Sequence, residues 1–412
     1  MNNPTLSLQI QSDLDLLPNQ TASQRVLELV IQSPPAHQRA GRPRLNLALV
    51  IDRSGSMHGA KLEYVKRAAE HILDLLQNDD RAALVTYDNH VDVLAPATLM
   101  NEEVRAEIKT RIRRLDSGNT TNLSGGWLAG CQEVASGAEP ERLNRALLLT
   151  DGLANQGITD EETLYQHARE LAVRGVTTST FGVGEGFNEH LLEGMSNQGG
   201  GSFYFIGSPA EIPAIFEREF KELAAVTAKD VELEIELPAG VSCQVLGEWR
   251  TQDEDRRLKI YLNPLYGGRT QEVYLKLLLP PASGQDKLEI KLTVRARGSE
   301  NQLLEAKAAA AFHYADQQLV QATPPRREVL ERFARVDMAQ VTSEALKLER
   351  RGERDRARKM VQNSLSLNAP YLAPAEESEY QDMAKRMENG MDELDRKQTH
   401  YRSYNVKRGR ES

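Results

Sequence analysis

Three oxygen-bearing side chains stand at alternate positions of one short segment. Asp52, Ser54 and Ser56 directly follow the apolar run 47–51. One carboxylate and two hydroxyls are hard oxygen donors, the ligands that Mg²⁺, Mn²⁺ and Ca²⁺ prefer in proteins. Gly55 lets the chain turn tightly between them, because glycine has no Cβ. The segment predicts a turn that can hold a divalent cation, with a plain helix-capping turn as the alternative.

A second carboxylate and further hydroxyls follow later in the chain. Asp151 lies just beyond the apolar run 146–149, and the polar loop 117–123 carries Thr120 and Thr121. In an open α/β sheet, functional groups gather beyond the carboxyl ends of the strands, at the point where the strand order reverses. We therefore expect Asp52 and Asp151 to meet at one sheet edge, together with hydroxyl groups.

The usual enzyme signatures are missing from the sequence. No Gly-x-x-x-x-Gly-Lys-Ser/Thr loop and no Gly-x-Ser-x-Gly elbow occurs, which removes P-loop nucleotide hydrolysis and serine hydrolase chemistry. A phosphoaspartyl transferase would need an acid two residues after Asp52, where Ser54 stands. The 8 histidines are scattered and only 2 cysteines occur, so no cluster competes for zinc. We expect no catalytic residues and no organic cofactor.

The elements that must position these groups are strands and helices in alternation. The apolar runs 47–51, 82–85 and 146–149 and the Thr-rich run 176–183 are typical of strands that are buried on both faces. Apolar residues recur at helical spacing between these runs. The pattern predicts a doubly wound α/β domain with a mostly parallel sheet over residues 43–225.

The flanking segments have other patterns. Residues 226–322 alternate apolar and polar positions and predict an antiparallel β-sandwich. Residues 1–42 carry two predicted strands, too few to stand alone, so we expect them to complete this sandwich around an inserted α/β domain. Pro34-Pro35 and Gly41-Arg42-Pro43 mark breaks. Residues 323–395 predict helices, and residues 396–412 a mobile basic tail.

Together these motifs resemble the von Willebrand factor type A domain. Its metal-ion-dependent adhesion site combines an Asp-x-Ser-x-Ser turn, a distant Thr and a distant Asp, which match the 52–56 turn, the 117–123 loop and the 150–152 segment. The family's usual Thr-Asp/Asn-Leu order favours Thr121 over Thr120. More loosely, the whole chain is similar to bacterial proteins that resemble inter-alpha-trypsin-inhibitor heavy chains. The resemblance implies five metal ligands: Asp52, Ser54, Ser56, Thr121 and Asp151.

The resemblance also implies a function. Neutral hydroxyls leave a bound cation under-neutralised, so a Glu or Asp of a partner protein can complete its coordination shell. We expect Mg²⁺, with Mn²⁺ or Ca²⁺ as alternatives. The expected function is a scaffold for metal-dependent protein–protein interaction. The alternatives are a self-assembling homo-oligomer that uses the same site between copies, and a regulatory subunit of an ATPase or of a kinase–phosphatase system.

Composition limits the partners further. The chain of 412 residues has 51 Lys and Arg against 60 Asp and Glu, a formal net charge of −9. An acidic chain is a poor binder of nucleic acid, whose phosphates are held by clustered Lys and Arg. No apolar span is long enough for a membrane helix, and the polar N-terminus does not resemble a signal peptide. The sequence thus predicts a protein of the cytoplasm, and the resemblance implies a bacterial one.

Overall fold

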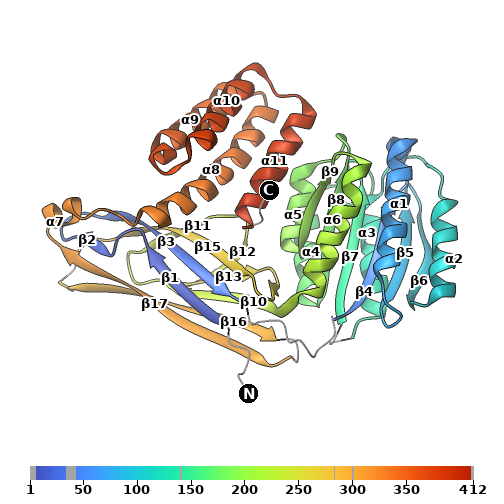
Figure 1. The fold of residues 1–412 in the computed structure, drawn as a ribbon, viewed down its shortest axis with the longest axis horizontal. Helices are drawn as coiled ribbons and strands as arrows, with labels where there is room; N and C mark the ends of the chain where they lie inside the picture. Colours follow the sequence, from blue (N-terminus) through green and yellow to red (C-terminus); the bar gives the residue numbers. More distant parts are fainter. Residues whose placement is uncertain (1–5, 34–42, 140–141, 283, 299–300, 410–412) are drawn as a thin grey trace. The chain divides into compact units, whose positions relative to one another are not determined.

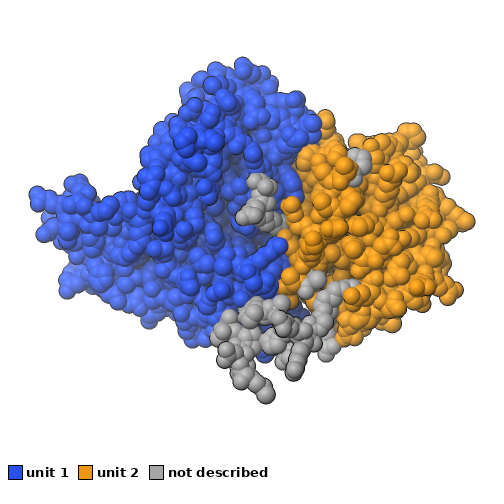
Figure 2. Space-filling view, viewed as in Figure 1, with its two compact units in different colours: residues 1–35, 227–298, 302–412 blue, residues 36–226, 299–301 orange. Residues whose placement is uncertain are grey.

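The chain forms two compact units in the computed structural model, which describes residues 6–33, 43–139, 142–282, 284–298 and 301–409 (Figure 2). The sandwich unit comprises Met1–Pro35, Thr227–Gly298 and Gln302–Ser412, and the α/β unit comprises Ala36–Val226 and Ser299–Asn301. The predicted breaks at Pro34-Pro35 and Gly41-Arg42 lie outside the described residues, as does the predicted domain boundary after residue 42.

The α/β unit is built on one sheet with the strand order β6-β5-β4-β7-β8-β9 (Figure 1). Neighbouring strands are parallel except β5 and β6, which form an antiparallel pair. From β4 the chain continues to β5 on one side and later to β7 on the other, so β4 lies at the switch point of the sheet. The strands are β4 (Arg44–Asp52), β5 (Arg81–Tyr87), β6 (Val91–Leu99), β7 (Arg142–Thr150), β8 (Val176–Val183) and β9 (Gly200–Ile206).

Helices cover this sheet. Helix α3 packs on β4, β5 and β7, α4 and α5 pack on β8, and α1 contacts α2 and α6. Side-chain caps begin several of these helices: Asn122 accepts from the Gly125 N–H of α3 at 3.0 Å, for example. The helices are α1 (Ala60–Leu75), α2 (Glu102–Arg113), α3 (Leu123–Ser136), α4 (Glu161–Val173), α5 (Glu189–Gln198) and α6 (Ile212–Ala224), with short 3₁₀ turns η1 (Gly55–Met57) and η2 (Pro209–Glu211).

The edge strand β6 is an element that the apolar pattern did not predict. Most of its residues are at least partly exposed, so it carries no continuous apolar run. It follows β5 through a tight turn in which the Asp88 carboxylate accepts from the His90 N–H at 2.7 Å. Such an edge strand is fixed by backbone pairing with its neighbour, which leaves little trace in side-chain pattern.

The sandwich unit contains two sheets, in the orders β1-β3-β15-β11 and β12-β13-β10-β16-β17-β2. β3 pairs antiparallel with β15 over ten residue pairs, Ser23 to Gln32, which joins the N-terminal segment to the later one. Alternate residues of both sheets form one apolar core. The strands are β1 (Ser7–Ser12), β2 (Leu16–Pro18), β3 (Ser23–Gln32), β10 (Val226–Glu236), β11 (Ser242–Val245), β12 (Arg250–Glu254), β13 (Arg257–Leu262), β14 (Leu265–Tyr266), β15 (Thr270–Leu279), β16 (Lys287–Gly298) and β17 (Leu303–Ala315).

The same unit ends in helices, of which α8 contacts α9 and α11, and α9 contacts α10 (Figure 1). Within the described residues, none of the helices combines the length and the apolar character that a membrane crossing requires. The helices are α7 (Gln317–Ala322), α8 (Arg327–Arg350), α9 (Arg354–Asn368), α10 (Pro374–Asn389) and α11 (Glu393–Lys407), with the 3₁₀ turn η3 (Ala369–Tyr371).

Helix α11 corrects the prediction of a mobile basic tail over residues 396–412, of which 410–412 lie outside the described residues. Arg396 donates to the buried carboxylate of Glu349 in α8, with Nε 2.5 Å from Oε2. Lys407 Nζ lies 3.7 Å from Glu248, and the Arg408 guanidinium lies 4.1 Å from the ring centre of Trp249. The basic residues therefore have partners that are distant in sequence, which a local charge count cannot reveal.

Candidate functional site

The two predicted carboxylates lie at the ends of neighbouring strands. In the parallel pair β4 and β7, Ile51 is opposite Leu149. Asp52 and Asp151 therefore leave the sheet at the same edge, and both side chains are buried. The location is the one that the strand pattern predicts, because β4 stands at the switch point of the sheet.

The turn after β4 is held by its own polar groups. The Asp52 carboxylate accepts the Ser54 backbone N–H at 2.8 Å. The Ser54 and Ser56 hydroxyl oxygens lie 3.2 Å apart, and the Ser56 hydroxyl donates to Asp151 Oδ1 at 2.8 Å. The Gly55 N–H donates to the carbonyl of Asn119 at 2.7 Å, which ties this turn to the 117–123 loop. The turn thus carries its two hydroxyls to the second carboxylate.

Thr121 lies at the same place, whereas Thr120 is exposed. The Thr121 side chain is buried, and its backbone N–H donates to Asn155 Oδ1 at 2.9 Å. A Cβ built on Gly152 would lie 3.3 Å from Thr121 Oγ1 and 3.4 Å from Asp52 Oδ2. The Thr121 hydroxyl and the Asp52 carboxylate therefore both border the same small space beside Gly152, where a side chain would make tight contacts.

Three further residues belong to this site but were given no role from the sequence. The Thr150 hydroxyl donates to Asp52 Oδ2 at 2.6 Å and accepts the Gly152 N–H at 3.1 Å. Tyr87, opposite Asp52 in the pairing of β4 with β5, is completely buried. Lys61, in the first turn of α1, makes an ion pair with Asp151. Thr150 and Tyr87 could have been identified from the sequence, because both lie at the end of a strand. Asp52 and Asp151 were identified from their positions at strand ends.

The charges of the site are incompletely balanced. Burial raises the pKa of Asp52 to about 6. Hydrogen bonds from Thr150 and Ser54 lower this pKa in part, and the negative charge of Asp151 raises it further. Burial, and then the charge of Asp52, also raises the pKa of Tyr87. Raised pKa values at a cluster of carboxylates are typical of a site that gains from a bound cation.

The donor set fits a hard divalent cation. Two carboxylates and three hydroxyls offer oxygen only, the ligand type of Mg²⁺, Ca²⁺ and Mn²⁺. Across the described part of the chain, no group of three or more His, Cys, Asp or Glu side chains is arranged to hold a metal ion. A cation at this sheet edge would therefore need the hydroxyl oxygens of Ser54, Ser56 and Thr121 in addition to the two carboxylates.

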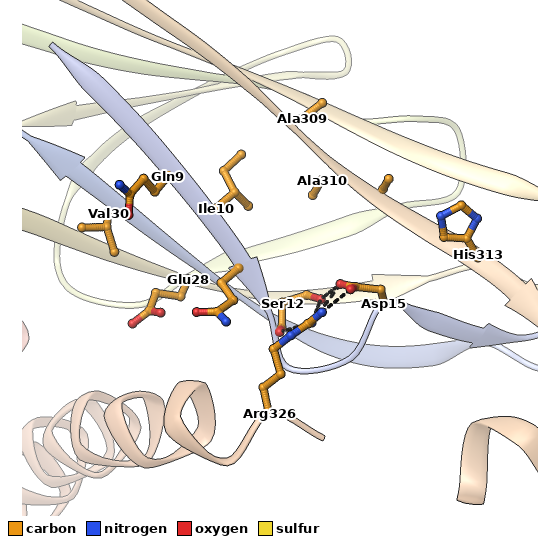
Figure 3. Close-up of a pocket in the computed structure, with 12 residues that line it drawn as sticks. Gln9, Ile10, Ser12, Asp15, Glu28, Val30, Ala309, Ala310, His313 and Arg326 are labelled. Atoms are coloured by element: carbon orange, nitrogen blue, oxygen red, sulfur yellow. Dashed lines mark hydrogen bonds and ion pairs between the residues drawn. The ribbon is translucent and has the colours of Figure 1, made fainter. Parts of the chain in front are cut away.

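A pocket in the sandwich unit is the main alternative site. It measures about 530 Å³ and lies between β1, β3 and β17. Its charged groups already contact each other (Figure 3): Arg326 Nη1 donates to Asp15 Oδ1 at 3.0 Å and to the Ser12 carbonyl at 2.8 Å. Glu28, also in its lining, receives two hydrogen bonds from Arg332, at 2.5 and 2.6 Å. These pairings leave the pocket with less unmet charge than the sheet edge around Asp52.

The fold and the site define a doubly wound α/β domain with an oxygen-rich site at its switch point. Residues 46–218 match the sequence profile of the von Willebrand factor type A domain. The chain therefore contains a von Willebrand factor type A domain, which confirms the resemblance found in its motifs. Domains of this family generally mediate protein–protein interactions.

Some relatives match nearly the whole chain, and others match only about half of it. The protein sll0103 from Synechocystis sp. is 28% identical in an alignment of 407 positions that covers 94% of each chain. YfbK from Escherichia coli is 32% identical over 203 residues, 48% of this chain and 35% of YfbK. Inter-alpha-trypsin inhibitor heavy chain H1 from Mesocricetus auratus is 31% identical over 199 residues, 46% of this chain and 21% of that protein. This chain thus matches about a third or less of the length of the last two.

Two solved structures resemble nearly the whole chain. A von Willebrand factor type A protein from Catenulispora acidiphila has a TM-score of 0.75 at 18% identity and covers 97% of this chain and 96% of its own. The ArnB paralog VWA2 from Sulfolobus acidocaldarius has a TM-score of 0.66 at 18% identity, with 98% of both chains covered. At this identity the likeness concerns the fold, and it confirms the predicted fold class.

Proposed function

We propose that this protein binds a partner protein through a divalent cation at the edge of the α/β sheet. The cation would be held by oxygen atoms of the following residues: Asp52, Ser54, Ser56, Thr121 and Asp151. Mg²⁺ is the first candidate, because it prefers hard oxygen ligands and keeps some of its waters, with Mn²⁺ and Ca²⁺ as alternatives. The observation that carries the proposal is the convergence of Thr121 Oγ1 and Asp52 Oδ2 on the small space beside Gly152, where a side chain would make tight contacts.

The chain's own groups hold the ligand oxygens in place. The hydrogen bonds from Thr150 and from the Ser54 N–H orient the two oxygens of Asp52. The Ser56 hydroxyl does the same for Asp151. Such partners fix the direction of a ligand's lone pairs, and they commonly change metal affinity when they are removed. The site is therefore organised by the fold itself.

The rim of the site indicates the kind of partner. A bound cation would supply a positive centre that accepts a carboxylate oxygen from a partner's Glu or Asp. Ser56, Asn119 and Thr120 are exposed around this centre and carry no charge. Leu153, two residues after Asp151, is 54% exposed and adds an apolar contact. We infer that the recognised feature is an acidic side chain on a protein surface, and that the interaction is one of binding without chemical turnover.

Affinity capture from an extract of the source organism tests this proposal. The immobilised full chain should retain a set of proteins in Mg²⁺ and release them in EDTA. The variant Asp52→Asn should retain none of that set, because it lacks one of the two carboxylates. A set of proteins that is retained equally by both chains, or equally with and without EDTA, would refute the proposal. Retention of the chain itself would identify self-assembly as the interaction.

A further inference from the structure

Lys61 brings a positive charge into the site. It lies in the first turn of α1, and its ammonium contacts Asp151 Oδ2. The Asp151 side chain is 0% exposed and that of Lys61 is 34% exposed. Lys61 is therefore anchored at its charged end against a buried acid, although part of its stem reaches solvent.

The loop between β8 and α5 is shaped around this lysine. A Cβ on Gly184 would lie 3.2 Å from Lys61 Cε, and one on Gly186 would lie 4.0 Å from Lys61 Nζ and 2.8 Å from the Asp151 carbonyl oxygen. Gly184 also has a φ of +69°, a conformation that L-residues with a side chain rarely adopt. Two glycines thus leave the space that the lysine and the end of β7 occupy.

The position of Lys61 has two opposite electrostatic consequences. The ammonium neutralises a buried carboxylate, and a buried carboxylate without a partner is costly. A divalent cation that uses Asp151 would share this carboxylate with the ammonium, and two positive groups on one carboxylate repel each other. The same contact therefore stabilises the chain when no divalent cation is bound and weakens the binding of a divalent cation.

We propose that Lys61 is the resident cation of the adhesion site: it stabilises the chain when no divalent cation is bound, and it competes with the divalent cation for Asp151. The inference rests on the proposed metal site and goes further, because it assigns to this chain a built-in limit on metal affinity. A conventional supporting residue would only strengthen the site. Lys61 instead sets how much free cation is needed before the site is loaded.

The test compares Lys61→Met with Lys66→Met in the full chain. Lys66 lies in the same helix and pairs with Glu63 at 2.8 Å, away from the site, so its variant removes the same charge. In EDTA, Lys61→Met should unfold about 2–8 °C below Lys66→Met, because Asp151 loses its counter-charge. In a calorimetric titration with Mg²⁺, Lys61→Met should bind about tenfold more tightly than Lys66→Met, because the repulsion is gone.

The two measurements together separate this role from simple packing. A lysine that merely supports the fold would lower the melting temperature without raising the affinity for Mg²⁺, and that result would overturn the inference. Equal affinities in the two variants would overturn it as well, while wild-type binding of Mg²⁺ would still uphold the metal site. No Mg²⁺ binding by the wild-type chain would instead refute the proposed function. Lys61→Gln, which keeps a hydrogen-bond donor, should show the higher affinity with a smaller loss of stability.

Discussion

Buried acids in two regions of this molecule have opposite surroundings. Glu28 in the sandwich unit faces the guanidinium of Arg332 through two hydrogen bonds and receives a third from Tyr274, at 2.9 Å. Asp52 in the α/β unit receives hydrogen bonds from the Thr150 hydroxyl and the Ser54 backbone N–H, at 2.6 and 2.8 Å. The first acid is matched by a full opposite charge. The second is oriented without being neutralised, which is the condition under which a bound cation contributes most.

We call a buried acid that is matched by an opposite charge a closed arrangement, and one without such a match, like Asp52, an open arrangement. The α/β unit itself also contains a closed arrangement. Burial alone would raise the pKa of Glu219, but the charge of Arg145 and hydrogen bonds from Ser179 and Tyr204 outweigh it and lower the pKa. The pKa of Asp52 is instead raised to about 6, chiefly by burial. The contrast shows that burial does not decide the behaviour of an acid; the charge of its partners does.

The largest expected effect comes from opening a closed arrangement. Arg145→Met should lower the free energy of unfolding by about 3–5 kcal/mol, because it leaves Glu219 buried without a counter-charge. Urea unfolding measures this loss. The control is Arg113→Met, whose ion pair with Glu70 is at the surface, so its loss should change the free energy of unfolding far less. Equal losses in the two variants would contradict the distinction between closed and exposed pairs.

Filling the open arrangement should stabilise the fold. Mg²⁺ at a hundred times its dissociation constant should add about 2.7 kcal/mol to the unfolding free energy, since it binds the folded chain. The thermal midpoint should rise accordingly, and EDTA should reverse the rise. The variant Asp52→Asn should show neither change. A rise of equal size in that variant would place the cation somewhere else.

Acid should weaken the open site before it disturbs the closed one. With a pKa of about 6, Asp52 is mostly protonated at pH 5, so the apparent affinity for Mg²⁺ should fall about tenfold between pH 7 and pH 5. In EDTA the same raised pKa means that the contribution of Asp52 to stability decreases as the pH rises through about 6. Glu219 has the opposite sign: its lowered pKa makes a contribution that is lost only as the pH falls below the ordinary glutamate range. Titrations at pH 5, 6 and 7 measure the affinity, and a flat affinity would count against Asp52 as a ligand. Melts in EDTA, extended from pH 7 down to pH 3, measure the two stability trends, because the trend of Glu219 lies below the ordinary glutamate range.

The smallest effect is expected at the pocket of the sandwich unit. The hydrogen bond from Arg326 holds the pKa of Asp15 below its usual range, but the side chains of Asp15 and Arg326 are 44% and 41% exposed. Asp15→Asn should therefore cost no more than about 1 kcal/mol in urea unfolding. It should also leave the affinity for Mg²⁺ unchanged in calorimetry. A loss of affinity in this variant would show that the pocket, and not the sheet edge, holds the cation.

The sequence predicted the parts of this molecule that depend on local pattern. Asp52 and Asp151 were placed at strand ends because apolar runs precede them, and the structure brings them to one edge. Lys61 was missed because its partner, Asp151, is 90 residues away in the chain. The tail was mistaken for the same reason, since Arg396 pairs with Glu349 in another helix. Local pattern identifies strands and turns, whereas charge pairing across the fold becomes visible only in three dimensions.

The choice between Thr120 and Thr121 shows where spacing alone was insufficient. Both carry a hydroxyl in the same loop, and only the family's residue order favoured Thr121. In the structure Thr121 is buried near Gly152 and Thr120 is exposed. The role of Thr121 as a ligand stays a prediction, and Thr121→Val, which removes the hydroxyl at nearly constant volume, is the variant that addresses it.

Calorimetric titration of Mg²⁺ into the EDTA-treated and dialysed full chain tests the central claim most directly. The account predicts one binding site per chain in the wild type and no measurable binding in Asp52→Asn, which keeps the shape of the side chain and removes its charge. No binding in the wild type, or binding that is unchanged in Asp52→Asn, would contradict the account.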